Sequence, residues 1–246
     1  MSSPKLTTDF NREALPSGGA LPAQGADLWQ ADLDLFPTEM LPLLRTWLSP
    51  EELTRVERLI PALPRRRTLV MRGLLRWLLA SYLQSPPAAV DFTYAAHGKP
   101  LVVPPPGRTA VQFNVSHSQN LGWLAVARCE VGLDVEKQRE NLAMAALVER
   151  YFSARERTRF RELSAPEQTP WFFRCWTRKE ALLKACGLGI QLPLDELDVG
   201  GDEATPVLTL EGIPWQLLDV TEGHASASLA VPLGKVVEVR RGKVAW

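Results

Sequence analysis

The chain has 246 residues, of which 46% are hydrophobic and 23% charged, and its 28 basic side chains equal its 28 acidic ones. This composition is that of a soluble globular protein, long enough for one large domain or two of about 120 residues. The balance of charge argues against general nucleic-acid binding, which usually accompanies an excess of basic residues.

The sequence shows no sign of a membrane or secretory protein. No apolar run approaches the roughly eighteen residues that a membrane-spanning helix needs, and no basic segment followed by an apolar one opens the chain. The cysteines, Cys129, Cys175 and Cys186, lack the spacing of a metal site and are typical of reduced thiols. We therefore expect a cytoplasmic protein with no membrane partner.

Residues 1–27 are rich in Ser, Pro, Gly and Ala without periodicity, which predicts a flexible N-terminal arm. Residues 28–36 alternate well enough for a first strand. Ser49 followed by Pro50 has the pattern of a helix N-cap and first helical position, so a short helix is predicted to about residue 60.

Residues 65–84 form the first long predicted helix, which is apolar around most of its circumference. Arg72 and Arg76 share a face with Arg65, and we expect this face to meet solvent. Arg67 instead continues the apolar side at the helix N-terminus, where free N–H groups favour an anion. The alternative is that Arg67 only extends past the helix end into water.

Short strands and turns are predicted between this helix and residue 136, including a turn at 96–100 that presents Lys99. The strands are expected at 91–95, 111–115, 122–128 and 131–136. Helical patterns return at 141–152 and 153–163, and a polar break at 164–169 precedes a second long helix over 171–189. Further strands are expected at 192–199, 207–211, 215–220, 227–231 and 236–240.

The order of elements predicts an α+β fold of two pseudo-symmetric halves, residues 28–122 and 123–246. Each half would pack one long helix on a small antiparallel sheet. No sequence repeat accompanies this duplicated pattern.

Glu180 has an unusual place in the second long helix. At 100° per residue, Phe173, Trp176 and Lys184 lie within about 40° of it, so a carboxylate interrupts an aromatic stripe that should face the core. Arg174 and Arg178 point to the opposite side, which we expect to face water. A buried carboxylate costs several kcal/mol without a cation. The alternative is a surface ion pair between Glu180 and Lys184.

Asp134 and Glu136 are two residues apart on a predicted strand, so both leave the same face. Paired carboxylates suit a hard cation, most often Mg²⁺, and Glu180 would add a third oxygen ligand. Most such pairs simply lie on a solvated face. Several groups that bind phosphate accompany these carboxylates, and together they indicate a pyrophosphate ligand, although each alone is unremarkable in a protein. They are Arg67, Lys99, Ser116, His117 and Lys184.

Four ordered motifs resemble those of the surfactin-type 4′-phosphopantetheinyl transferases. They are Gly98-Lys99-Pro100, Phe113-Asn114-Val115-Ser116-His117-Ser118, Val131-Gly132-Leu133-Asp134-Val135-Glu136, and Trp176-Thr177-Arg178-Lys179-Glu180-Ala181 with Lys184 and Gly187-Leu188-Gly189. The resemblance extends over most of the chain after residue 48. It implies a monomer with the active site in the cleft between two halves. The implied reaction moves 4′-phosphopantetheine from coenzyme A to a serine of an apo acyl or peptidyl carrier protein and releases 3′,5′-ADP.

The resemblance also implies roles for individual residues. Asp134, Glu136 and Glu180 would hold Mg²⁺, with Mn²⁺ as an alternative, and Glu180 would act as the base for the carrier serine. Lys184 would contact the pyrophosphate and protonate the leaving group. The other implied contacts with coenzyme A are Arg55, Arg67, Lys99, Ser116 and His117.

One departure from the family concerns the helix that follows Ser49. The family commonly has two basic residues there for the 3′-phosphate, whereas this chain has Glu52 and Arg55, and only Arg55 could serve. For the carrier protein, an exposed apolar strip is expected near the second half. Its candidate residues are Phe152, Phe160 and Leu163, with core packing the expected fate of at least one.

Two other functions fit the residues. The same three carboxylates could serve an Mg²⁺-dependent hydrolase of a phosphate ester or pyrophosphate, which would need no carrier. A binding module without activity would use Asp134, Glu136 and Glu180 only structurally, and replacing Glu180 with Gln would then change neither activity nor affinity for Mg²⁺.

Overall fold

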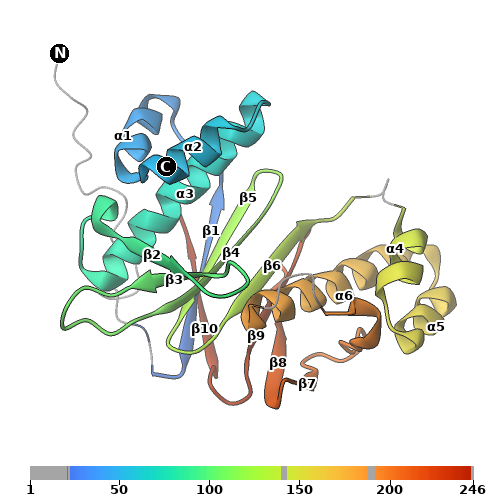
Figure 1. The fold of residues 1–246 in the computed structure, drawn as a ribbon. Helices are drawn as coiled ribbons and strands as arrows, with labels where there is room; N and C mark the ends of the chain where they lie inside the picture. Colours follow the sequence, from blue (N-terminus) through green and yellow to red (C-terminus); the bar gives the residue numbers. More distant parts are fainter. Residues whose placement is uncertain (1–20, 22, 140–142, 188–191, 245–246) are drawn as a thin grey trace.

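The computed structural model describes residues 21, 23–139, 143–187 and 192–244, and it has the α+β fold expected from the sequence (Figure 1). The helices are α1 (Leu41–Trp47), α2 (Pro50–Glu57), α3 (Ala62–Leu83), α4 (Met144–Tyr151), α5 (Ala154–Glu162) and α6 (Ala165–Cys186), with short 3₁₀ helices η3 (Thr38–Met40), η4 (Pro87–Ala89) and η6 (Leu194–Glu196). The strands are β1 (Gly25–Asp32), β2 (Asp91–Tyr94), β3 (Pro100–Val103), β4 (Gln112–Ser118), β5 (Leu121–Ala127), β6 (Gly132–Lys137), β7 (Val207–Leu210), β8 (Ile213–Asp219), β9 (Ala225–Pro232) and β10 (Glu238–Lys243).

The first sheet has the strand order β10-β1-β5-β4, and helix α3 packs against it. Side chains alternate along β1, so Trp29 faces the α3 core whereas Leu28 faces the core of the second sheet. Strands β1 and β10 pair in parallel, with Gly25 opposite Glu238. Strand β10, from the far end of the sequence, therefore completes the first sheet, and the boundary expected at residue 122 falls inside β5.

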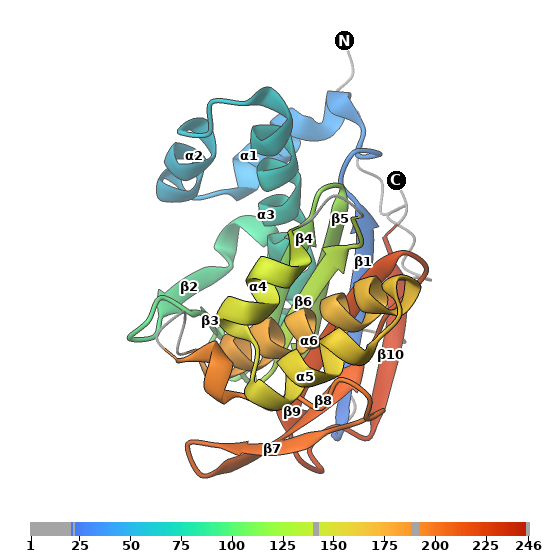
Figure 2. The same ribbon diagram turned by 90° about the vertical axis from the view of Figure 1, so that its right-hand side faces the viewer.

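The second sheet has the order β6-β9-β8-β7 and is antiparallel throughout. Helix α6 lies across it, with α4 and α5 beside it (Figure 2). At Gly132, a Cβ atom would lie 1.9 Å from the Ala181 carbonyl oxygen. A glycine there lets β6 approach α6 closely, two residues before Asp134.

Several helix ends follow the predicted local chemistry. Ser49 caps α2 and forms a capping box with Glu52, and Ser153 and Glu156 do the same for α5. A third capping box, at Ser164 and Glu167, starts α6 six residues before the predicted position, within the segment expected to be a polar break. The helix ends at Cys186, and the predicted residues Leu188 and Gly189 lie outside the described part of the chain.

Two predictions about individual elements were wrong, and two further elements were not predicted. The first strand begins at Gly25, because its pairing with β10 draws in part of the expected arm. Residues 192–199 contain a 3₁₀ helix instead of a strand. Helix α1 and strand β3 were not predicted, since both are short and lack a clear period.

The expected solvent faces of the two long helices were also wrong. Arg76 is only 4% exposed and Arg178 is fully buried. Arg76 donates to Glu52 and to the carbonyls of Pro87 and Val90, because α2 and the segment before β2 cover that face of α3. None of the described helices combines the length and apolar character that a membrane crossing requires.

Candidate active site

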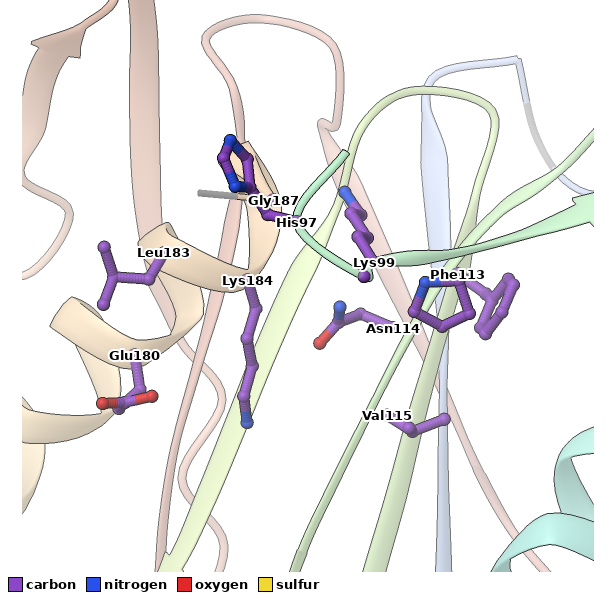
Figure 3. A pocket seen from close by; sticks show the side chains of 11 residues that line it. His97, Lys99, Phe113, Asn114, Val115, Glu180, Leu183, Lys184 and Gly187 are labelled. Atoms are coloured by element: carbon purple, nitrogen blue, oxygen red, sulfur yellow. The ribbon is translucent and has the colours of Figure 1, made fainter. Parts of the chain in front are cut away.

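A cavity of about 280 Å³ lies where the β2–β3 turn, strand β4 and helix α6 meet (Figure 3). Glu180 and Lys184 line it from α6, and Phe113 and Asn114 line it from β4. Lys99 lines it from the β2–β3 turn. The cavity therefore joins residues from three of the four sequence motifs. The fourth motif, on β6, lies directly behind Lys184.

Strands β4 and β6 belong to different sheets but are connected by side chains at every second residue. Three polar side chains of β4 accept hydrogen bonds from backbone N–H groups of β6. The bonds are Leu133 N to Asn114 Oδ1 (3.0 Å), Val135 N to Ser116 Oγ (3.2 Å) and Lys137 N to Ser118 Oγ (3.2 Å). The polar residues of the β4 motif thus replace the backbone partners that β6 would have in a continuous sheet.

The two serines of this connection also orient the carboxylates of β6. Each hydroxyl accepts from an amide, so its own proton is free for a carboxylate. Ser116 Oγ donates to Asp134 Oδ1 at 2.9 Å, and Ser118 Oγ donates to Glu136 Oε2 at 2.7 Å. Both carboxylates are therefore held toward the junction of the two sheets.

Lys184 joins this cluster from α6. Its Nζ lies 2.6 Å from Asp134 Oδ1 and 3.1 Å from Ser116 Oγ. Asp134 is 4% exposed, and its second oxygen, Oδ2, is buried without a hydrogen-bond partner. An unpaired carboxylate oxygen in such a place is costly, so this atom indicates a missing positive group.

The other two carboxylates also lack compensation. Burial raises the pKa of Glu180, and the negative charge of Asp134 raises it further, against the opposing charge of Lys184. Burial raises the pKa of Glu136 as well, although the hydrogen bond from Ser118 opposes the shift. Lys184 acts on this cluster and Arg139 also acts on Glu136, so the three carboxylates still outnumber the cations beside them.

A hard cation suits this donor set. Among the described residues, His, Cys, Asp and Glu side chains form no group of three that could hold a metal ion. Mg²⁺ does not need one, because it keeps several waters and commonly takes only one or two carboxylates together with substrate phosphates. The free Oδ2 of Asp134 and the raised pKa values of Glu136 and Glu180 are what such an ion would relieve.

The structure places His117 near the cluster but Arg67 in an ion pair. His117 is exposed at its edge, and its pKa is lowered, first by loss of solvation and then by the charges of Lys184 and Arg67. Arg67 binds Asp34 through two bonds, Nε to Oδ1 at 2.8 Å and Nη2 to Oδ2 at 2.5 Å. An incoming phosphate would have to compete with this carboxylate.

Two further residues of the predicted set have protein partners. Arg55 donates to the Tyr94 hydroxyl at 3.3 Å, and its guanidinium lies over the Tyr94 ring. Glu52, the departure from the family pattern, is 5% exposed and binds Arg72 and Arg76. Glu52 is thus part of the internal packing between α2 and α3.

Buried charges behind Glu180 were missed by the sequence reasoning. Lys179 is fully buried and lies 2.8 Å from Glu156, and it also donates to the carbonyls of Leu194 and Leu197. The only sequence signal was the capping box that places Glu156 in the first turn of α5. His97 was also missed as a lining residue, although it directly precedes Gly98-Lys99-Pro100.

The expected apolar strip for a carrier protein is mostly not exposed. Phe152 is fully buried and Phe160 is 6% exposed, because both pack on Trp171 of α6. Leu163 is half-buried. The aromatic residues of this strip thus stabilise the α4–α5–α6 layer. Core packing was expected for at least one candidate and is found for both Phe152 and Phe160, so the prediction that they form an exposed strip was wrong.

Comparison with known proteins identifies the family of this chain. Residues 37–129 match the family model of the 4′-phosphopantetheinyl transferase N-terminal region, and residues 130–230 match that of the 4′-phosphopantetheinyl transferase superfamily. The chain belongs to this superfamily and is a 4′-phosphopantetheinyl transferase.

Named relatives place it among the surfactin-type members. It is 36% identical to the 4′-phosphopantetheinyl transferase HetI of Nostoc sp. strain PCC 7120, over 83% of this chain and 86% of the relative. It is 35% identical to a putative 4′-phosphopantetheinyl transferase of Synechocystis sp. strain PCC 6803, over 68% of this chain and 69% of the relative. It is 29% identical to Sfp of Bacillus subtilis strain 168, over 63% and 66% of the two chains.

Proposed function

We propose that this enzyme transfers 4′-phosphopantetheine from coenzyme A to a serine of an apo acyl or peptidyl carrier protein, with Mg²⁺ and with release of 3′,5′-ADP. The observation that carries the proposal is the cluster of Asp134, Glu136 and Glu180 around a single ammonium, with one buried carboxylate oxygen left unpaired. Carboxylate oxygens are suitable ligands for a divalent ion such as Mg²⁺. The same ion also binds the phosphates of a pyrophosphate.

Asp134, Glu136 and Glu180 would hold the ion. When bound, Mg²⁺ would offset the negative charge that develops on the pyrophosphate as the leaving group departs. Lys184 would contribute a second positive charge to the same phosphates from the wall of the cavity. Lys184 already binds the Oδ1 atom of Asp134, so the ion would be held through the unpaired Oδ2.

The chemistry that remains for the protein is proton transfer and positioning. The oxygen of the carrier serine forms a bond to the phosphorus that bears the pantetheine arm, and the bond from that phosphorus to the oxygen bridging to 3′,5′-ADP breaks. Glu180 takes the serine proton, as its place in the wall of the cavity would allow. Lys184 then supplies a proton to the departing ADP.

The nucleotide end of coenzyme A is proposed to occupy the cavity beside Phe113 and Asn114. Ser116 and His117, which follow Asn114 and Val115 on β4, would lie toward its phosphates. Arg67 would join them only by leaving Asp34. Arg55 is proposed for the 3′-phosphate, and Tyr94 would then be the partner that it gives up.

The test is incubation of the protein with coenzyme A, Mg²⁺ and several apo carrier proteins, followed by mass spectrometry of the carriers. A carrier that gains the phosphopantetheine arm, with 3′,5′-ADP in the supernatant, supports the proposal. Consumption of coenzyme A without any modified carrier would contradict it and favour the hydrolase. Omitting Mg²⁺, or adding Mn²⁺ in its place, tests the metal separately.

A further inference from the structure

Lys99 lines the candidate cavity with its aliphatic stem, but its ammonium points elsewhere. In Figure 3 the Lys99 and Lys184 side chains extend in opposite directions. The Lys99 Nζ donates to the backbone carbonyl of Ala185 at 2.7 Å and to Glu130 Oε2 at 2.7 Å. The Lys99 side chain is 9% exposed, so these bonds lie largely out of solvent.

The Ala185 carbonyl belongs to the last turn of α6. Carbonyl groups there have no partner within the helix, and the helix dipole makes this end negative, so a lysine ammonium is well suited to it. Lys184 and Glu180 project from the two turns that lead to this end. A bond at Ala185 therefore holds the C-terminal end of this helix, beyond both residues.

Gly187 makes the contact between Lys99 and the helix end possible. It ends α6 in the left-handed conformation, with φ of 69°, and a Cβ atom there would lie 3.2 Å from the Lys99 Cδ. The lysine stem thus packs on a position kept free of a side chain. The Gly98-Lys99-Pro100 motif and the glycine after Lys184 meet directly.

Glu130 adds a third segment, the turn between β5 and β6. Its carboxylate is 46% exposed, whereas the lysine that it binds is almost buried. One ammonium therefore joins the β2–β3 turn, the end of α6 and the β5–β6 turn. The first and second of these both line the cavity.

We propose that Lys99 is a positioning residue that holds the β2–β3 turn against the end of α6, and that it is not a direct ligand of a coenzyme A phosphate. This proposal rests on the proposed function, because it assumes that coenzyme A binds in the cavity. It replaces the phosphate contact that the sequence motif implied for Lys99. Removing the lysine would loosen both walls and weaken nucleotide binding without touching the reacting groups.

A change at Glu130 tests the proposal, because a phosphate-binding role and a positioning role of Lys99 predict opposite changes in the KM for coenzyme A. If Lys99 were a phosphate ligand, Glu130→Gln would free the ammonium and remove a competing negative charge, so the KM for coenzyme A would fall. If Lys99 holds the walls together, the same change weakens the contact and the KM rises about threefold, as expected for weakening one charged hydrogen bond. The control is Glu39→Gln, which neutralises an exposed glutamate elsewhere.

Replacing Lys99 itself should change the KM for coenzyme A more than replacing Glu130. Lys99→Met should raise the KM for coenzyme A about tenfold, because two charged hydrogen bonds are lost, with kcat within about twofold of wild type. Lys99→Arg should restore part of the loss. The increase should be equal for coenzyme A and 3′-dephospho-coenzyme A. A loss that disappears with the dephospho substrate, or a lower KM in Glu130→Gln, would overturn the proposal. Lys235→Met is the control for loss of an exposed lysine.

Hydrogen exchange without any ligand separates this proposal from the proposed function. In Lys99→Met, amides of residues 95–100 and 183–187 should exchange faster, whereas those of α3 should not change. That result supports the positioning role even if wild type modifies no carrier. Unchanged exchange in both segments would refute it even if wild type is fully active.

Discussion

Helices α3 and α6 occupy corresponding places in the two halves, and each has 22 residues. The buried charges of α3 are fully paired: Arg76 binds Glu52 and two backbone carbonyls. Helix α6 is paired on one side only. Lys179 behind it binds Glu156, whereas Glu180 in front has no ion-pair partner among the described residues and shares the charge of Lys184 with Asp134. The difference supports the proposal that the active site lies at Glu180, because a buried carboxylate without its own ion-pair partner would gain most from a bound cation.

The largest expected effect comes from breaking the paired side of α6. Lys179→Met leaves the Glu156 carboxylate buried without its cation, so we expect a loss of about 3–5 kcal/mol in the free energy of unfolding. Urea unfolding followed by circular dichroism measures it. Lys235→Met, at an exposed position, should leave the midpoint unchanged. An unfolding midpoint of Lys179→Met close to that of wild type would mean that the Lys179–Glu156 pair does not stabilise the fold, so that the contrast between the two sides of α6 fails.

Changing Glu180, on the unpaired side of α6, should have the opposite effect: a large loss of activity without a loss of stability. Glu180→Gln removes the proposed base and a metal ligand, so transfer should fall by about 10²-fold or more. The free energy of unfolding should stay the same or increase, because a carboxylate whose pKa is raised by burial is removed. Initial rates of carrier modification and urea unfolding are the two measurements. A variant that unfolds more easily than wild type would show that Glu180 is a structural residue.

In the first half, the ion pairs of Glu52 with Arg72 and Arg76 can be tested by the pH dependence of the free energy of unfolding. Burial opposes ionisation of Glu52, but its bonds to Ser49, Arg72 and Arg76 hold the pKa of this carboxylate below the ordinary value of 4.5. The unfolded chain then binds a proton first as pH falls. The stabilisation from Glu52 is complete above about pH 4.5 and is lost below it, as pH falls through the lowered folded-state pKa.

The measurement is the free energy of unfolding between about pH 3 and 6 for wild type and Glu52→Gln. Because Glu52 binds at most one proton, the slopes of the unfolding free energy against pH can differ between the two proteins by at most about 1.4 kcal/mol per pH unit. The variant should be less stable at pH 6, and the gap should narrow toward pH 3. Parallel curves would mean that the Glu52 carboxylate is not held ionised by its arginines.

The smallest effect is expected from the serines between the two sheets. Ser118→Ala removes the hydrogen bond that orients Glu136, worth about 1 kcal/mol, so transfer should fall roughly fivefold at limiting Mg²⁺. Saturating Mg²⁺ should recover most of the rate. The matched control is Ser81→Ala on α3, whose hydroxyl donates only to the Trp77 carbonyl. Equal rates for Ser118→Ala and wild type at every Mg²⁺ concentration would remove Ser118 from the metal site.

Local patterns predicted much of the fold and the centre of the site. The period of two on β6 correctly put Asp134 and Glu136 on one face, and the helical period placed Glu180 near Lys184. The prediction that Arg178 faces water was wrong because α6 is covered on both sides. A helical wheel assigns faces, but only the packing of the 194–206 segment shows which face is covered.

Contacts between segments far apart in the sequence account for the other differences between the predicted and the observed site. Nothing near Lys99 in the sequence shows that its partners are Ala185 and Glu130, since both lie in other segments. The same holds for Arg67, which is bound by Asp34 from the loop after β1. In both cases the sequence motif identified a residue at the cavity or its edge, and the tertiary contacts decide which atoms it faces.

The pairing of β10 with β1 has a consequence for how this protein is made. Asp27 on β1 is 1% exposed and binds Arg240 on β10, although the two are 213 residues apart. A ribosome makes β1 before β10, so the edge of β1 that pairs with β10 stays open, and Asp27 lacks Arg240, until β10 has been made. The sheet of the first half can therefore be completed only after the second half has been synthesised.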